Sequence, residues 1–319
     1  MVQSNEAASS EAGGDDIVMS FRTERSGMVG RIVRLGPAVD TILTRHDYPP
    51  AVAEVLGEAL AAAALIGSGL KFPGRFIVQT KSDGPLGFLV VNYETPGKLR
   101  GYASFDAARL AAHQADGKAA GSLLGEGHLA MTIDPDGDME RYQGVVALDG
   151  ASLGDAVLGY FRQSEQLPTF VRLAVARVAR AGGRGWHWRA GGLMVQSLAP
   201  EGGHGRSLVE EEGEALAGAD DDAWRRVEML AATVEAHELT DPTLTPERLL
   251  FRLLHEEGVR VYAPAPLDVY CRCSRERVGA FLTSFADDGM DDMRDADGSV
   301  TVTCEFCRTP YRFEAGETT

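Results

Sequence analysis

The stretch that organises this 319-residue chain is Pro50-Ala-Val-Ala-Glu-Val-Leu-Gly-Glu-Ala-Leu-Ala-Ala-Ala-Ala-Leu-Ile-Gly67. Apolar residues recur along it at the spacing of one helix face, namely Val52, Val55, Leu56, Leu60 and Ala64. Prolines precede it and glycines follow it, as is typical of helix boundaries. Because alanine lets neighbouring elements approach closely, we expect a core helix here.

Segments that follow this helix carry the signals of β-strands. The clearest are 75–80, 87–93, 128–133 and 142–148, with a turn at Asp134-Pro135-Asp136-Gly137-Asp138. A second helix is expected over residues 153–161, with further strands around 171–175 and 193–198 on either side of a glycine-rich turn. Strands and helices do not alternate regularly, so the pattern predicts an α+β fold with an antiparallel sheet built from hairpins.

The chain is strongly acidic, with 31 Lys and Arg against 47 Asp and Glu, and a formal net charge of -16. Binding to DNA or RNA depends on basic residues that displace counterions from phosphates. The composition therefore disfavours a nucleic-acid partner. Hydrophobic residues make up 44% of the chain, an ordinary value for a folded protein, and the length favours roughly two domains.

We expect a cytoplasmic protein without a membrane segment. The longest uninterrupted apolar stretch, 59–67, is shorter than the roughly 18 to 20 residues that cross a bilayer. Residues 1–15 are rich in Ser, Ala, Gly and acids, and they lack the basic and apolar regions of a signal peptide. They are predicted to form a disordered leader.

The composition changes sharply at residues 210–222, which contain seven acids and no base and indicate a solvated connector. Two amphipathic helices are expected after it. The first opens at Asp220-Asp221-Asp222, and the second has Thr245 as its N-cap, a stripe of four leucines and Gly258 as its stop. Such stripes usually pack onto a core. The alternative hypothesis is that this connector is the part of the chain that can be uncovered.

The four cysteines of the chain are confined to two motifs near its end, Cys271-Arg272-Cys273 and Cys304-Glu305-Phe306-Cys307, separated by thirty residues. In a reducing compartment such a cluster favours a metal site or a redox sensor over structural disulfides. Two close thiol pairs match the way a tetrahedral zinc site is assembled. Residues 261–319 are poor in apolar side chains, so zinc would also stabilise this small module.

Four thiolates would fill the coordination sphere of one zinc ion, which disfavours a zinc hydrolase because no position remains for water. Two alternatives stay open. The first is a redox switch, in which peroxide oxidises the thiolates, disulfides form and zinc is lost. The second is a static zinc knuckle for RNA or protein recognition, supported by Arg272, Arg275 and Arg277. Aspartates in the same module oppose RNA binding, namely Asp287, Asp288, Asp291, Asp292, Asp295 and Asp297.

These motifs resemble the thirty-three-kilodalton heat-shock chaperonin family, the bacterial redox-regulated holdases. The order Cys-x-Cys, long gap, Cys-x-x-Cys is the most specific part of the resemblance. Segments earlier in the chain are also similar, among them Arg45-His46-Asp47-Tyr48-Pro49, Arg100-Gly101-Tyr102, Tyr160-Phe-Arg-Gln-Ser-Glu-Gln166 and Gly191-Gly-Leu-Met-Val-Gln196. The similarity spans about residues 16 to 315. His46 lies in one of these segments, but the sequence suggests no role for it.

The resemblance implies a chaperone rather than an enzyme, one that needs no ATP and is inactive when reduced and bound to one zinc ion. Oxidative stress with heat is implied to form the disulfides Cys271 with Cys273 and Cys304 with Cys307 and to release the zinc. The linker then unfolds, apolar surface binds unfolding client proteins, and the active form dimerises. The sequence holds no P-loop motif, in agreement with a chaperone that uses no nucleotide.

Together these considerations predict four parts. They are a disordered leader (1–15), an N-terminal mixed sheet-and-helix domain that binds clients (16–202), an acidic stretch with a metastable helical linker (203–260), and a small C-terminal zinc-binding redox-switch domain (261–319). The fold class expected for the whole is α+β.

Overall fold

The computed structural model describes residues 14–117, 120–179, 182–183, 185–197, 221–284, 294–314 and 317. The predicted leader up to residue 13, the acidic stretch up to residue 220 and the boundary near residue 202 lie outside the described residues, as do four of the aspartates noted above, Asp287, Asp288, Asp291 and Asp292. Asp15, the last residue of the predicted leader, is described, and its carboxylate accepts a hydrogen bond from Arg189 Nη1 at 2.6 Å. Folded structure therefore begins slightly before residue 16.

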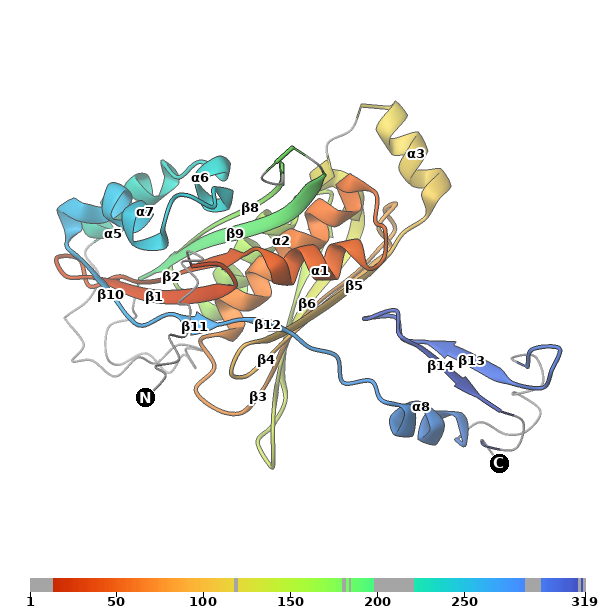
Figure 1. Ribbon diagram of the computed structural model, residues 1–319. Helices are drawn as coiled ribbons and strands as arrows, with labels where there is room; N and C mark the ends of the chain where they lie inside the picture. Colours follow the sequence, from red (N-terminus) through yellow and green to blue (C-terminus); the bar gives the residue numbers. More distant parts are fainter. Residues whose placement is uncertain are drawn as a thin grey trace, which may run out of the picture.

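One antiparallel sheet, sheet A, has the strand order β10-β1-β2-β9-β8. Its strands are β1 (Ile17–Thr23), β2 (Val29–Leu35), β8 (Thr169–Ala179), β9 (Trp186–Gln196) and β10 (Val259–Val261), and β11 (Ala265–Pro266) also pairs with β1. Strands from both ends of the chain thus lie side by side in this sheet (Figure 1).

A second sheet, sheet B, has the order β12-β5-β4-β3-β6-β7. Its strands are β3 (Gly74–Ser82), β4 (Phe88–Glu94), β5 (Lys98–Ser104), β6 (Glu126–Pro135), β7 (Tyr142–Asp149) and β12 (Asp268–Val269). All pairings are antiparallel except that of β12 with β5. The expected antiparallel sheet of hairpins and the α+β class are confirmed.

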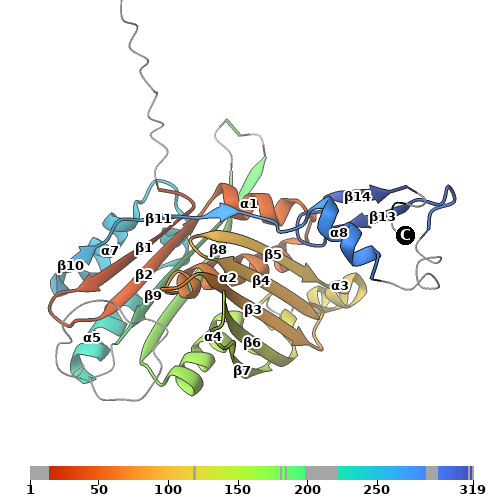
Figure 2. The ribbon, with the colours of Figure 1, turned by 90° about the horizontal axis from the view of Figure 1, so that it is seen from below.

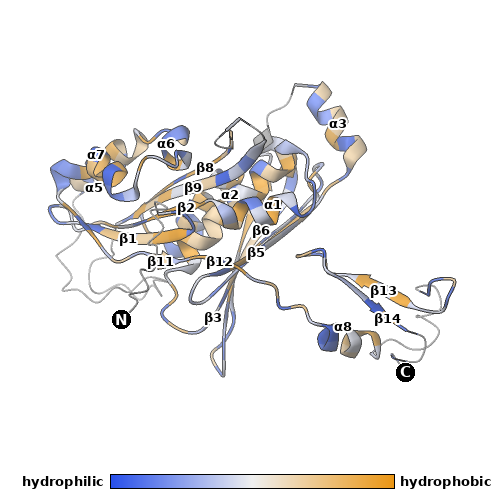
Figure 3. Cartoon of the chain, in the orientation of Figure 1, coloured by the Kyte–Doolittle hydropathy of each residue, from blue (hydrophilic) through white to orange (hydrophobic). Residues whose placement is uncertain are grey.

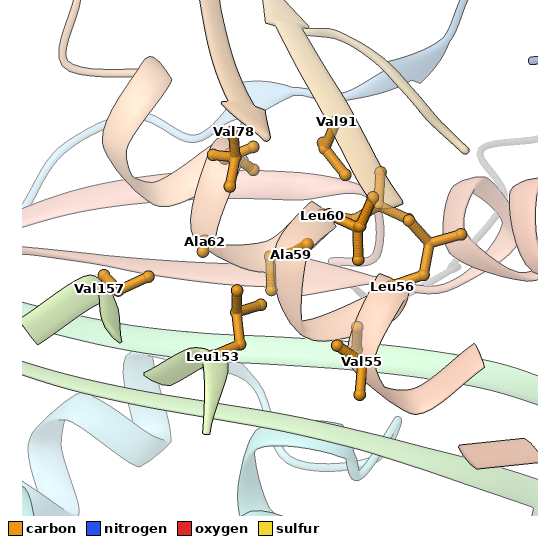
Figure 4. Packing of buried hydrophobic residues seen from close by; sticks show 14 of the residues in the cluster. Val55, Leu56, Ala59, Leu60, Ala62, Val78, Val91, Leu153 and Val157 are labelled. Carbon is orange, nitrogen blue, oxygen red and sulfur yellow. The ribbon is translucent and has the colours of Figure 1, made fainter. Parts of the chain in front are cut away.

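The predicted core helix, α2 (Pro50–Gly67), lies between the two sheets, and most of its residues are buried. Figure 4 shows Leu56 and Leu60 of this helix packed with Val91 of sheet B, and Leu153 and Val157 of a shorter helix on another side. That shorter helix is α4 (Leu153–Tyr160). The remaining helices of this region are α1 (Pro37–Thr44), α3 (Ala107–Ala115), η1 (Ala120–Leu124) and η2 (Phe161–Glu165).

Helix α2 is long and apolar enough, by composition, to cross a membrane, with a mean hydropathy of 1.5 over 18 residues. Figure 3 shows the helix coloured by the hydropathy of its residues. In the fold 78% of that window is buried, as expected for the core helix of a globular domain. Glycine permits its close approach to sheet A, because a Cβ on Gly192 would lie only 2.8 Å from Leu65 Cδ1.

The outer face of sheet A is covered by helices that belong to the predicted linker. These are α5 (Asp221–Ala232), α6 (Ala236–Thr240) and α7 (Pro246–Leu254), followed by η3 (His255–Glu257). The predicted N-cap is present, since the Thr245 side chain accepts a hydrogen bond from Arg248 N, and Gly258 ends the segment with φ of 68°. The four leucines of α7 are buried against the sheet, so the expected packing of these stripes is confirmed. Helix α6 was not predicted.

Two arginines of sheet A anchor the linker through its backbone carbonyls. Arg34 Nη1 donates to Leu244 O at 2.7 Å and also contacts Asp241 O, while Arg189 Nε donates to Thr240 O at 2.7 Å. Both side chains are almost fully buried. Burial lowers the pKa of Arg34, and the nearby Arg189 charge acts in the same direction. The guanidinium groups of Arg34 and Arg189 are therefore buried only while the linker covers sheet A.

After the linker the chain returns across both sheets before it reaches the cysteines. Residues 259–270, here called the strap, contain β10, β11 and β12 (Figure 2). The predicted terminal module starts at residue 261, but residues 261 to 269 add strands to the larger sheets instead. What remains is a small unit of α8 (Arg275–Leu282), β13 (Val300–Thr303) and β14 (Pro310–Phe313), whose buried cluster is Leu282, Val300 and Phe313.

We predict that one glutamate of α2 makes stability depend on pH. Burial, with smaller contributions from Glu54 and Asp155, raises the pKa of Glu58 to about 7. The unfolded chain loses this proton near pH 4.5 and the folded chain only near pH 7, so the free energy of unfolding falls as pH rises between these values. Glu58→Gln should therefore unfold at higher urea concentration than the wild type at pH 8, with the difference shrinking towards pH 5. Glu140→Gln, at an exposed position, serves as the control, and equal midpoints for Glu58→Gln and wild type at pH 8 would contradict the prediction.

Candidate metal centre

All four cysteines meet at one point of the small C-terminal unit. Their Sγ atoms lie within 4.8 Å of one another, with Cys271 and Cys304 at 3.6 Å and Cys273 and Cys307 at 3.3 Å. Sulfurs at the corners of a tetrahedral zinc site are about 3.8 Å apart, given a Zn–S bond of about 2.3 Å. In the described part of the chain no carboxylate or imidazole joins this cluster. The donor set and its spacing fit zinc.

The local backbone explains why the two motifs converge. Cys304 and Cys307 occupy the turn between β13 and β14, where Cys304 N donates to Thr309 O at 3.0 Å and Arg308 N to Cys304 O at 2.8 Å. Arg308 adopts a left-handed conformation with φ of 60°, which closes this turn. On the other side Cys273 directly precedes Ser274, the N-cap of α8. A tight turn and a helix start therefore present the two thiol pairs to each other.

The thiols influence one another's protonation. Burial raises the pKa of Cys271 to about 12 and also raises the pKa of Cys304. Burial acts in the same direction on Cys307, but hydrogen bonds with Thr309 and with the thiols of Cys273 and Cys271 outweigh it and lower its pKa to about 6. Tyr311 adds a hydrogen bond from its hydroxyl to Cys273 Sγ at 3.1 Å. The cluster thus favours one thiolate surrounded by hydrogen-bond donors, and a divalent cation would displace the remaining protons.

The turn that carries Cys304 and Cys307 also contacts three residues from the N-terminal part of the chain, His46, Arg100 and Tyr102. His46 Nε2 lies 3.3 Å from Phe306 O, and the Arg100 guanidinium lies 4.1 Å from the centroid of the Phe306 ring. The ring of Tyr102 is 6.4 Å from that of Phe306. Sequence reasoning missed this contact. The only signal for it was the similarity of the segments 45–49 and 100–102 to the family motifs.

The three arginines that supported a nucleic-acid knuckle are engaged inside the protein. Arg272 Nε pairs with Glu94 at 3.2 Å, and Arg277 Nη1 donates to Arg272 O at 2.9 Å. Arg275 donates to Arg312 O at 2.6 Å and pairs with Glu317 at 2.8 Å. These contacts reduce what the arginines can offer to phosphate groups, so the RNA-binding alternative loses its best support.

Comparison with known proteins identifies the family of the chain and agrees with the fold. The family model described as Hsp33 protein matches residues 16–314. A 33 kDa chaperonin of Caulobacter vibrioides is 45% identical over 303 residues, which cover 94% of this chain and 95% of that protein. A 33 kDa chaperonin of Ectopseudomonas mendocina is 38% identical over 95% of this chain and 94% of its own length.

A solved structure shows the same fold. The crystal structure of the 33 kDa chaperonin (heat shock protein 33 homolog) of Thermotoga maritima superimposes with a TM-score of 0.73 over 95% of this chain and 96% of that chain, at 22% identity. Because the family match covers nearly the whole sequence and relatives share up to 45% identity across it, the chain belongs to the Hsp33 protein family.

Proposed function

We propose that this protein is an ATP-independent chaperone whose activity is controlled by the redox state of its four cysteines. The observation that carries the proposal is an apolar sheet face covered by the linker helices, which the strap joins directly to a four-thiol centre. In the reduced state Cys271, Cys273, Cys304 and Cys307 would hold one zinc ion, and the linker would stay on sheet A. The named relatives, all 33 kDa chaperonins, support the chaperone role.

Zinc would serve a structural purpose at this site. Among the described residues of the small unit, the buried apolar side chains are Leu282, Val300 and Phe313, and such a core is too small to fold stably without a further cross-link. A bound zinc ion ties both thiol motifs together and withdraws charge from four thiolates. Since binding requires the folded arrangement of the thiols, metal binding and folding of this unit would be one equilibrium.

Oxidation would remove the ligands. Cys271 with Cys273 and Cys304 with Cys307 are the disulfides we propose, since each pair is close in the chain and all four sulfurs lie within reach of one another. As each disulfide forms, its two thiolates give two electrons to one hydrogen peroxide, which takes up two protons from solvent and leaves as two water molecules. Disulfide sulfurs do not bind zinc as thiolates do, so the ion would dissociate and the unit would unfold.

Unfolding at the centre would expose the face of sheet A. Beneath the linker lie apolar side chains of the sheet, namely Met19, Phe21, Ile32, Leu193 and Val195, together with Met28 from the turn before β2. Apolar burial is non-directional, so this surface would accept many unfolding clients. We further propose that the active form is a homodimer in the cytoplasm, and the net charge of -16 would help to keep it soluble while apolar surface is exposed. No nucleotide or nucleic acid takes part in this cycle.

The zinc site is tested by removing one ligand. We expect Cys304→Ser to bind zinc at least about 100-fold more weakly than the wild type under reducing conditions, because a ligand contributes more than the outer-shell groups whose loss costs 10- to 100-fold. Hydrogen exchange of residues 271–284 and 294–314 should rise in the same variant. Thr303→Ser, at the neighbouring exposed position, should change neither quantity. Full zinc occupancy with unchanged exchange in Cys304→Ser would exclude the site.

The chaperone role is tested by following zinc and aggregation together. Peroxide at elevated temperature should release one zinc ion per chain to a chelating dye, and the oxidised protein should then suppress light scattering by a thermally unfolding client without ATP. The reduced protein should not suppress it. Peroxide that releases no zinc, or an oxidised protein that leaves client aggregation unchanged, would overturn the proposal.

The covering role of the linker is tested at a glycine of β9. A Cβ on Gly191 would lie 2.2 Å from Leu239 O, so Gly191→Ala should push α6 away from the sheet. We expect faster hydrogen exchange across residues 221–257 and client binding after milder oxidation. Gly159→Ala is the matched control, because a Cβ there meets no atom within 4 Å. A linker that remains as protected in Gly191→Ala as in Gly159→Ala would contradict its close packing on the sheet.

A further inference from the structure

Phe306 lies next to the cysteines in the sequence, but its side chain contacts the large domain. It lies between Cys304 and Cys307, inside the turn that presents both thiols. Its ring packs under the guanidinium of Arg100 at 4.1 Å and near Tyr102, and its carbonyl faces His46 Nε2 at 3.3 Å. The position of these contacts is therefore fixed by the same turn that positions two of the four sulfurs.

Aromatic and polar neighbours build the receiving surface for Phe306. The His46 ring stacks on Tyr48 with centroids 4.8 Å apart, and the Tyr48 hydroxyl accepts a hydrogen bond from Ala103 N at 3.0 Å. Because Tyr48 is buried in the main core, this surface belongs to the rigid part of the domain. The ion pair of Arg272 with Glu94 and the hydrogen bond between Tyr102 and Glu305 add two contacts at its edges.

Strand β5 connects this surface to the strap. Arg100 and Tyr102 lie on β5, and the strap pairs with the start of the same strand, where Asp268 N donates to Gly97 O at 2.8 Å and Tyr270 N to Leu99 O at 2.9 Å. Lys98 Nζ also lies 4.4 Å from the centroid of the Tyr270 ring. The last residues of the strap and the tip of the thiol turn thus dock side by side on one strand. A short parallel pairing of two residues is weak alone, so it depends on what holds the chain beyond it.

We propose that the docking of Phe306 on Arg100, Tyr102 and His46 transmits the state of the thiol centre to the strap and through it to the linker. While the four thiols are held together, residues 304–307 keep their turn, Phe306 stays docked, and the strap is pinned at both ends of β12. When the thiols separate, the turn unfolds and Phe306 no longer contacts β5. The strap can then dissociate, first from β5 and then from β1. This inference rests on the proposed function for its consequence in client binding, but the docking step stands on the contacts themselves.

His46, for which the sequence suggests no role, helps to hold Phe306 in place. The imidazole fixes the Phe306 carbonyl from one side while the Arg100 charge attracts the ring face from the other. Phe306 is not among the candidate metal ligands. It acts as a positioning residue whose effect should appear in the strap before any zinc is lost.

The test compares hydrogen exchange at the amides of residues 267–270 in full-length reduced protein loaded with zinc. Phe306→Ala and Arg100→Gln should each exchange there about 3- to 10-fold faster than the wild type, the range expected for loss of a cation–π contact at a partly buried site. Zinc content, measured with a chelating dye, should stay at one ion per chain in Arg100→Gln, since this residue lies outside the metal turn. Removing zinc from the wild type by chelation should accelerate the same amides, whereas chelation should add little in Phe306→Ala.

Phe281→Ala is the matched control, because it removes an equally large ring from the same small unit at a position that is 58% exposed. It should leave residues 267–270 protected. Unchanged exchange at these amides in both Phe306→Ala and Arg100→Gln would overturn the docking role, and so would a wild type in which chelation leaves them protected. If exchange changes as expected but oxidised protein fails to suppress client aggregation, the docking step holds and the chaperone proposal fails.

Discussion

Sheet A has apolar side chains on both faces, and this constraint shapes the rest of the structure. Strand β2 is buried along its whole length, with Val33 and Leu35 facing α2 and Ile32 facing the linker. The inner face is covered permanently by the core helix. The outer face needs a second layer, and the chain supplies it from a segment nearly two hundred residues later. The strap and the small cysteine-bearing unit follow this layer in the chain.

The contacts that hold the linker are of two kinds with different consequences. Apolar packing of α5 and α7 supplies the free energy, since each buried large aliphatic side chain contributes about 1.5 to 3 kcal/mol. The buried Arg34 and Arg189 determine the position of the linker on the sheet. Their guanidinium groups donate hydrogen bonds to linker backbone carbonyls, those of Thr240, Asp241 and Leu244. A linker held in this way is well defined when folded. If the linker left the sheet, as proposed, both guanidinium groups would become hydrated, which would limit the cost of opening.

The strap explains how a small unit can influence a large sheet. It pairs with β1 at two places and with β5 at one, so it crosses both sheets between the linker and the first cysteine. Each pairing is only two or three residues long. Pairings this short are not stable alone and depend on the contacts made by the adjoining parts of the chain. In the proposed route, a disturbance at the thiol turn would reach the strap through the Phe306 contact and then pass along these short pairings to the linker.

Much of the fold was predictable from local patterns. Helical spacing identified α2, capping residues placed the start of α7 at Thr245, and alternation identified β3, β4, β6 and β7. The strands β1 and β2 were missed, and for β2 the reason is that burial on both faces removes the alternation that marks a half-exposed strand. Helix α6 is five residues long, too short for a period to show. The two cysteine motifs indicated their own convergence, since paired thiols at close spacing have few other uses in a reduced protein.

The sequence by itself determined the family, the α+β class, the core helix and the four thiols that meet at one point, because each of these depends on residue type and on spacing along a short stretch. Only the tertiary structure decided that residues 261 to 269 belong to the large sheets, that Arg34 and Arg189 hold the linker, and that Phe306 docks on His46 and Arg100. These contacts join residues separated by up to 260 positions, and no local periodicity records them. They arise from the order in which strands and helices are layered, which is a property of the whole chain.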